Sequence, residues 1–184
     1  MSDSGTDVFR RVIAALDRAG IPFMLTGSFA SSFHGVPRAT QDIDLVIAPD
    51  GERLRILARD LLTDGFYVDE DAALDALHDE ALFNAIDQRT AWKIDFIICK
   101  SRPFSQEEFG RRRRVVFDGL TLWIATVEDV LIAKLEWAAK GESRRQIDDC
   151  AQLLRVRGAE LDRAYLSRWI AELGLSAQWR DLTA

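Results

Sequence analysis

The chain of 184 residues carries a formal net charge of −6, and hydrophobic residues make up 48% of it. This length suits one domain with an apolar core, and the composition excludes a disordered chain. The acidic balance argues against non-specific coating of nucleic acid, although a local basic patch would still let an enzyme touch RNA. The run Arg111–Arg114 is the densest such patch, and a solvated turn between strands is the simpler interpretation of it.

No apolar run reaches the length of a membrane span, and residues 1–11 lack the apolar stretch of a signal peptide. We therefore expect a cytoplasmic protein with no membrane partner. Cys99 and Cys150 lie in apolar surroundings and are expected to be reduced, buried thiols. His34 and His78 lack the companions of a zinc site, so any metal must use oxygen ligands, which favours Mg²⁺ or Mn²⁺.

The first two thirds of the chain predict a mixture of helices and strands. In chain order we expect a helix at 8–19, a strand at 21–27, a helix at 28–35, a loop at 37–41, a strand at 42–48, a helix at 52–62, a strand at 91–100 and a hairpin at 115–126. The hairpin is expected to turn at Asp118 and Gly119. Residues 65–90 give a weaker signal, in which 81–90 is typical of a strand that leads into a turn.

The last third predicts helices. Thr126 is a good N-cap for a helix at 127–140, and a capping-box pattern at Ser143–Gln146 opens another helix that ends at Gly158. One more helix is expected at 161–173. The fold class is therefore α/β (α+β), a mixed sheet backed by helices, with residues 1–125 as the core and 126–184 as a helical extension packed on it in one compact unit.

Charged and aromatic residues in this extension have simple structural interpretations. Arg144, Arg145, Asp148 and Asp149 are expected on a solvated helix face, because the apolar stripe of this helix is formed by Ile147, Cys150, Ala151 and Leu154. A supporting role in a site stays open for Asp148. The tryptophans of the chain are expected in the core or an interface rather than as a platform for stacking bases.

Aspartates recur on one face of two expected strands. Alternation in residues 42–47 places Asp42 and Asp44 opposite an aliphatic face, with α-carbons about 6.5 to 7 Å apart. The same alternation in residues 92–98 places Asp95 opposite an apolar face. If the strands are neighbours in the sheet, the three aspartates form a triad.

Three carboxylates this close repel one another, and a pair of divalent cations would stabilise them. Two-metal sites of this kind support phosphoryl or nucleotidyl transfer. Gly27 and Ser28 supply a complementary feature, because a glycine before a helix lets backbone amides approach a phosphate. The alternative is that each aspartate pairs with an arginine or faces water.

The order of these features resembles a known family. Gly27 and Ser28, thirteen intervening residues and then Asp42-Ile43-Asp44 are similar to the signature of the nucleotidyltransferase superfamily related to DNA polymerase beta, with Asp95 as the later third acidic residue. The finer patterns at 38–45 and 126–154 resemble minimal nucleotidyltransferases of the AbiE-type toxin group.

The resemblance implies roles for these residues. Asp42 and Asp44 would bind two Mg²⁺ or Mn²⁺ ions and the triphosphate of a nucleoside triphosphate (NTP). Asp95 would bind the catalytic metal and help deprotonate the acceptor hydroxyl. Gly27 and Ser28 would hold the β- and γ-phosphates.

Three further nucleotide-binding residues follow from the same resemblance. Arg38 and Thr40 would line the entrance near the phosphates, and Lys134 would contact nucleotide or acceptor. For Lys134, a helix-surface position whose aliphatic stem covers its neighbours is an equal alternative.

The implied activity is metal-dependent transfer of a nucleoside monophosphate (NMP) from NTP to an acceptor hydroxyl, with release of pyrophosphate. The toxin resemblance suggests tRNA or a protein as acceptor, and a cognate antitoxin as partner. One alternative is a nucleotidyltransferase acting on a small molecule such as an aminoglycoside, which the acidic net charge fits better. Another is a catalytically inactive nucleotide-binding module.

Overall fold

The computed structural model describes residues 3–35, 37, 39–117, 119–141 and 144–183. Its helices are α1 (Asp3–Arg18), α2 (Gly27–His34), α3 (Gly51–Thr63), α4 (Glu70–His78), α5 (Pro103–Arg111), α6 (Val127–Ala139), α7 (Arg144–Arg157), α8 (Arg163–Glu172) and α9 (Ser176–Thr183). Its strands are β1 (Phe23–Leu25), β2 (Asp42–Ile47), β3 (Phe66–Val68), β4 (Leu82–Asp87), β5 (Lys93–Ile98), β6 (Arg113–Phe117) and β7 (Leu120–Ile124).

The described strands form one mixed sheet in the order β3-β4-β5-β2-β1-β7-β6. β2 lies at its centre, antiparallel to β1 and parallel to β5. The pairing between β2 and β5 sets Asp44 directly opposite Asp95 and Asp42 opposite Lys93. The expected α/β fold with a mixed sheet is thus confirmed, and so is the adjacency of the two aspartate-bearing strands.

The two faces of the central strands differ in chemistry. Ile43, Leu45 and Ile47 of β2 are fully buried, as are Ile94 and Phe96 of β5. This apolar face packs into the core. The opposite face carries the aspartates, because successive side chains of a strand point in opposite directions.

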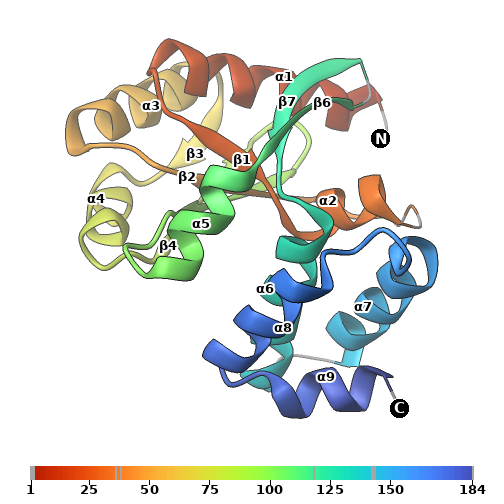
Figure 1. Cartoon of the computed structure of the whole chain (residues 1–184). Helices are drawn as coiled ribbons and strands as arrows, with labels where there is room; N and C mark the ends of the chain where they lie inside the picture. The colour runs from red at the N-terminus through yellow and green to blue at the C-terminus, as the bar shows by residue number, and fades with distance from the viewer. Residues whose placement is uncertain (1–2, 36, 38, 118, 142–143, 184) are drawn as a thin grey trace.

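Helices lie on both sides of the sheet (Figure 1). In that view α1 and α3 lie above it, while the C-terminal helices α6, α7, α8 and α9 gather below it. α6 begins where Thr126 accepts a hydrogen bond from the Asp129 amide at 3.3 Å, which confirms the predicted N-cap. α6 packs against α2 and α7 and lies across from the aspartate-bearing face.

Most of the predicted elements are confirmed, with boundaries shifted by a few residues. The hairpin of β6 and β7 is present with Phe117 opposite Leu120, and Gly119 adopts φ +77°, while Asp118 lies outside the described residues. Ser143 of the predicted capping box also lies outside them.

Four short elements were not predicted: β3, α4, α5 and α9. β3 has three residues, and α4 buries only Ala73 and Ala76, so neither has a strong apolar period. α5 makes the turn interpretation of Arg111–Arg114 wrong, because this run joins the end of a helix to the start of β6.

Candidate active site

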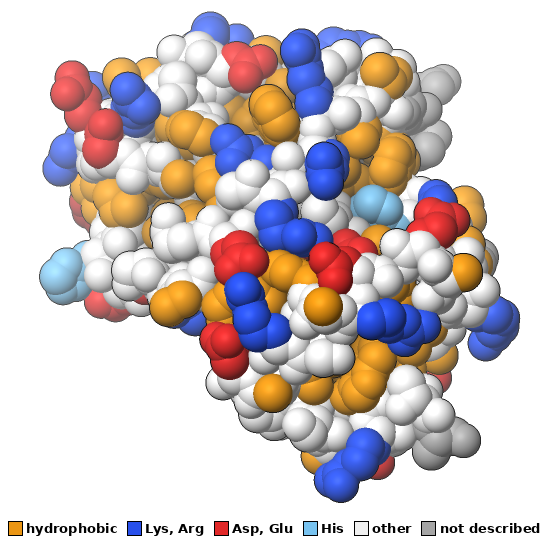
Figure 2. Space-filling view, in the orientation of Figure 1, with side chains coloured by type: hydrophobic (Ala, Val, Ile, Leu, Met, Phe, Trp, Pro, Cys, Tyr) orange, Lys and Arg blue, Asp and Glu red, His pale blue; other side chains and the backbone are white. Residues whose placement is uncertain are grey.

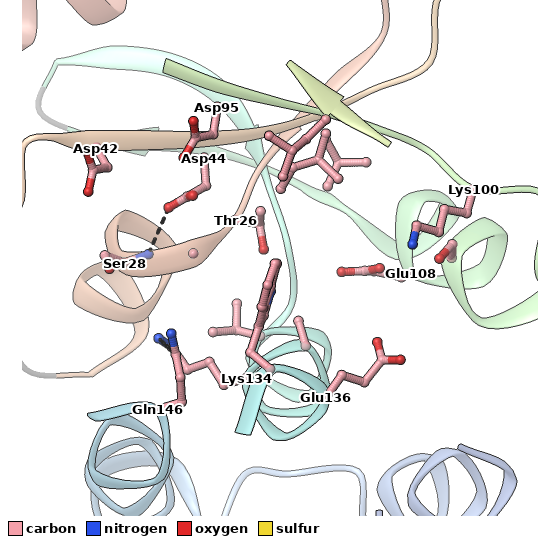
Figure 3. A pocket seen from close by; sticks show the side chains of 18 of the residues that line it. Thr26, Ser28, Asp42, Asp44, Asp95, Lys100, Glu108, Lys134, Glu136 and Gln146 are labelled. Atoms are coloured by element: carbon pink, nitrogen blue, oxygen red, sulfur yellow. Dashed lines mark hydrogen bonds between the residues drawn. The ribbon is translucent and has the colours of Figure 1, made fainter. Parts of the chain in front are cut away.

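A cavity of about 450 Å³ opens beside the aspartate-bearing face of the sheet (Figure 3). β2, β5 and the start of α2 form one side of it, and α5, α6 and the first turn of α7 form the other. Its volume lies within the range of roughly 300–1,000 Å³ that is usual for small-molecule sites. The predicted residues that line it are Gly27, Ser28, Thr40, Asp42, Asp44, Asp95 and Lys134.

Asp44 lies closest to the start of α2. The Ser28 amide donates to Asp44 Oδ2 at 3.4 Å, a long hydrogen bond. Burial raises the pKa of Asp44 to about 6, and the neighbouring charge of Asp95 contributes in the same direction. The carboxylate is therefore costly to ionise in this position, and a cation beside it would remove that cost.

Gly27 permits this arrangement. Its φ is +61°, in the left-handed region that favours glycine, and a Cβ at this position would lie 1.9 Å from Asp44 Oδ2. No side chain fits between the Gly27 backbone and the Asp44 side chain. The glycine of the Gly-Ser pair is thus required both by the turn into α2 and by the approach of Asp44.

Asp95 has two local partners. Lys93 Nζ lies 2.9 Å from its Oδ2, and the Asn84 amide donates to its Oδ1 at 2.8 Å. Lys93 follows from strand alternation, since it lies two residues before Asp95 on the same face. Asp95 therefore faces the other two aspartates and pairs with an ammonium group, not with a guanidinium.

The donor set fits a hard divalent cation. Two carboxylates in directly opposed strand positions, with a third from Asp42, offer the oxygen ligands that Mg²⁺ and Mn²⁺ prefer. Within the described part of the chain, no three acidic, His or Cys side chains are already gathered around one metal position. To become a ligand, Asp95 Oδ2 must exchange Lys93 for the cation.

Lys134 faces inward and is only 4% exposed. Its Nζ lies 2.7 Å from Asp149 Oδ2 and donates to Gln146 Oε1 at 3.0 Å, which joins α6 to α7. The surface alternative for Lys134 is therefore wrong. The solvated position expected for Asp149 is also wrong, because this side chain is 7% exposed, whereas Asp148 is exposed.

The other predicted contacts are more peripheral. Thr40 Oγ1 accepts a hydrogen bond from the Asp42 amide at 3.2 Å, so this threonine fixes the start of β2 while it lines the cavity. Arg38 lies outside the described residues. Arg145 is exposed and lines the cavity at the start of α7.

Several residues of the cavity were not predicted, among them Thr26, Glu108, Glu136 and Trp137. Thr26 was recognisable as the residue before the Gly-Ser pair. Glu108 lies on α5, whose Pro103 at the first position is a typical helix start that sequence reasoning overlooked. Trp137 is 37% exposed and lines the cavity, so it does not lie in the core, and the interface position expected as the other possibility stays a prediction.

Two arginines of the basic run at the end of α5 pack against aromatic rings of the protein itself. Arg111 lies over the Tyr165 ring, with its Cζ 3.7 Å from the centroid, and Arg112 lies over Phe109 at 4.2 Å. Figure 2 shows Lys and Arg side chains interspersed with Asp and Glu side chains over that face of the molecule. The expected basic patch is thus reduced to Arg113 and Arg114, which are exposed.

The two cysteines and His34 pack within the fold. Cys150 is fully buried and Cys99 is half-buried, and both are free thiols. Burial raises the pKa of Cys99 to about 11, so it is not an activated nucleophile. His34 Nε2 lies 2.7 Å from the Ala125 carbonyl oxygen.

Among the described helices, none combines the length and hydropathy that crossing a bilayer would require.

Comparison with known proteins places the fold. No protein-family model matches the chain, and no curated protein sequence does. Solved structures of nucleotidyltransferases do match over nearly their whole length. The fold is that of the nucleotidyltransferases.

Particular structures illustrate this similarity. The antibiotic-resistance factor ANT(2'')-Ia in solution is 18% identical with a TM-score of 0.62, and the alignment covers 95% of this chain and 97% of that one. A crystal structure of ANT(2'')-Ia in complex with adenylyl-2''-tobramycin is 17% identical in sequence with a TM-score of 0.61. The alignment covers 91% of this chain and 97% of that one. The lincosamide antibiotic adenylyltransferase LnuA, bound to lincomycin, is 9% identical with a TM-score of 0.57. The alignment covers 85% of this chain and 98% of that one.

Proposed function

We propose that this protein is a metal-dependent nucleotidyltransferase that moves an NMP from an NTP to an acceptor hydroxyl. The observation that carries the proposal is the direct opposition of Asp44 and Asp95 in one cavity, beside the Gly27 turn that opens α2. In the reaction a bond forms between the acceptor oxygen and the α-phosphorus, the bond to the β-phosphate oxygen breaks, and pyrophosphate leaves. The acceptor proton passes to a carboxylate.

Each side chain has a role in this proposal. Asp42, Asp44 and Asp95 hold the metal, taken as two Mg²⁺ or Mn²⁺ ions, which when bound would neutralise phosphate charge and stabilise the attacking and leaving oxygens. Asp95, whose carboxylate pairs with Lys93 in this structure, would also help to accept the proton of the acceptor hydroxyl.

The remaining predicted residues surround the triphosphate. The backbone at Gly27 and Ser28 binds its terminal phosphates at the positive end of α2. Thr40 lines the cavity, and the family resemblance implies that Arg38 would join it at the entrance. Lys134 would reach the phosphates from α6. Burial of Lys134 between α6 and α7 supports a fixed position for this ammonium group.

For the acceptor we propose a small hydroxylated molecule. The enclosed volume, the net charge of −6 and the similarity to enzymes whose structures hold adenylyl-2''-tobramycin or lincomycin support this choice. A second candidate is a toxin of the AbiE type that modifies tRNA or a protein and is held in check by an antitoxin. The sequence pattern Arg38-x-Thr40-x-Asp42-Ile43-Asp44 favours that candidate.

Incubation of the protein with Mg²⁺, each α-³²P-labelled NTP and a panel of acceptors tests the proposal. The panel contains aminoglycosides, lincosamides, total tRNA and total cell protein. We expect label in a small product, and a loss of at least about a hundredfold in Asp44→Asn, which keeps the size of the side chain. Asp75→Asn, on the exposed side of α4, is the control and should retain full activity.

Other outcomes discriminate among the alternatives. Label that enters only tRNA or protein would exclude the small-molecule acceptor and favour the toxin. Tight NTP binding without transfer to any acceptor would favour an inactive nucleotide-binding module. Transfer that is unaffected by Asp44→Asn would contradict the assigned site.

A further inference from the structure

Glu108 is a buried acidic residue for which the proposed transfer reaction has no use. It lies on α5, is only 8% exposed and lines the cavity. Figure 3 shows its carboxyl group directed into the cavity from the side opposite Asp44 and Asp95. Within the described ranges, its carboxyl oxygens have neither a hydrogen-bond donor nor an ion-pair partner.

The charged neighbours of Glu108 are already engaged with one another. Arg102 donates two hydrogen bonds of 2.6 Å each to the carboxylate of Glu136. Asp129, at the start of α6, accepts a hydrogen bond from the hydroxyl of Tyr165 at 2.6 Å and lies near Arg111. Glu108 is thus the carboxyl group of this cluster that is left without a counterion.

The other side chains near α5 do not provide a counterion for Glu108. Lys100 and Cys99, on the segment before α5, line the same end of the cavity, and Lys100 makes no ion pair with Glu108 among the described residues. Burial raises the pKa of Glu108 to about 8, and the charges of Asp129 and Glu136 add to this effect. Near neutral pH the free protein therefore holds a proton on Glu108, which an arriving cation would expel.

The side chains around Glu108 favour the binding of one class of ligand group. An anion would meet Glu108 and Glu136, and a divalent metal needs more oxygen ligands than one carboxyl group offers. An organic ammonium group needs one buried carboxylate and a largely dry wall. Trp137 lines the same cavity, and its ring, which attracts cations, already has Lys140 Nζ 4.9 Å from its centroid.

We infer that Glu108 binds an ammonium group of the acceptor, so that the substrate is a small amino alcohol that spans the cavity. The inference rests on the proposed transfer reaction for the position of the acceptor hydroxyl, which lies at the aspartates. The ammonium group then lies at the opposite side, against α5 and α6 (Figure 3).

Isothermal titration calorimetry tests this inference without any need for turnover. The probes are tobramycin, which carries amines and hydroxyls, and tobramycin acetylated on all its amines, which carries no ammonium charge. Titrations at pH 7.5 in phosphate and in Tris buffer, whose ionisation enthalpies differ, report protons released on binding. We expect wild-type protein to bind tobramycin with proton release and to bind the acetylated compound at least about tenfold more weakly.

Glu108→Gln keeps the shape of the side chain and removes its charge. We expect this variant to bind tobramycin about tenfold more weakly and to lose the proton release, with little change for the acetylated compound. Glu107→Gln is the matched control, because Glu107 is the adjacent residue and pairs with Arg168 outside the cavity. It should behave like the wild type.

The outcomes separate this inference from the transfer reaction. Equal binding of the two probes by wild-type protein, or unchanged binding and proton release in Glu108→Gln, would overturn the role of Glu108 even if transfer to a hydroxyl is observed. Charge-dependent binding that requires Glu108 would support the inference even if no NTP turns over, and in that case the transfer reaction alone would fail.

Discussion

Gly27 and Asp44 constrain each other through their close approach at the start of α2. In Gly27→Ala the new Cβ would collide with Asp44 Oδ2, and the φ of +61° would cost roughly 1–2 kcal/mol of stability. We expect the Asp44 carboxylate to be displaced and nucleotidyl transfer to fall by at least about tenfold. Activity assays and urea unfolding of the purified variant measure both effects.

A substitution at another glycine, Gly65, separates the effect of backbone strain from the effect of the contact with Asp44. Gly65 has φ +82°, and a Cβ there would meet no atom within 4 Å. Gly65→Ala should therefore lose similar stability and keep full activity. Equal loss of activity in the two variants would mean that stability alone is responsible and that the contact with Asp44 has no special role.

The sequence allowed prediction of residues whose positions depend on strand alternation. Asp42, Asp44 and Asp95 follow from a period of two and from one assumption about strand neighbours, which the register confirms. Glu108 and Asp149 could not be predicted in this way. Their burial depends on which side of a helix meets the cavity, and that is set by packing between elements far apart in the chain.

The contact between α6 and α7 depends on a buried ion pair. The side chains of Lys134 and Asp149 are 5% and 10% exposed, so removing the Lys134 ammonium leaves the Asp149 carboxylate in the interior without this ion pair. We expect Lys134→Met to lower the free energy of unfolding by about 3–5 kcal/mol. Urea unfolding, monitored by circular dichroism, measures this loss.

The double variant Lys134→Met with Asp149→Leu tests the cause. Replacing both partners by apolar residues removes both buried charges of the pair, so the double variant should be clearly more stable than Lys134→Met alone. If the two substitutions are simply additive, the pair does not couple α6 to α7.

Elements differ in how well the sequence predicts them. β2, β5 and α6 have long apolar patterns or clear caps, and their type was predicted correctly. α4 and β3 are short and bury few large side chains, so local sequence contains little information about them. They form because β4 offers β3 an antiparallel partner and because α3 packs against α4.

At the scale of the whole molecule, the cavity joins the two parts of the chain. Residues before 126 supply the aspartates and the start of α2, and residues after 126 supply Lys134, Trp137 and Gln146. Tyr165 and Asp162 also hold α8 to the start of α6, through hydrogen bonds to Asp129 and Glu128. We propose on this basis that 1–125 and 126–184 act as one compact unit.

The stability of the molecule should depend on pH through Glu108. The folded chain keeps a proton on Glu108 up to a pKa of about 8, whereas the unfolded chain releases it near 4.5. Because the folded state binds more protons in this window, the contribution of Glu108 to stability falls as pH rises from about 4.5 to about 8. The loss is on the order of 5 kcal/mol.

Glu108→Gln removes this titration. We expect its melting temperature to exceed that of the wild type at pH 9 and the difference to shrink towards pH 5. Differential scanning calorimetry across this range measures it, with Glu107→Gln as a control that should follow the wild type. A difference that does not change with pH would show that Glu108 is ionised throughout.

The opposition of Asp44 and Asp95 also determines where the chain can tolerate insertions and deletions. Residues 48–92 connect the two strands through α3, β3, α4 and β4, so loops there can change length while β2 and β5 remain aligned. A single residue added within either strand would turn the carboxylates into the apolar core. Divergent relatives should therefore vary in the length of this connection and keep both strands free of gaps.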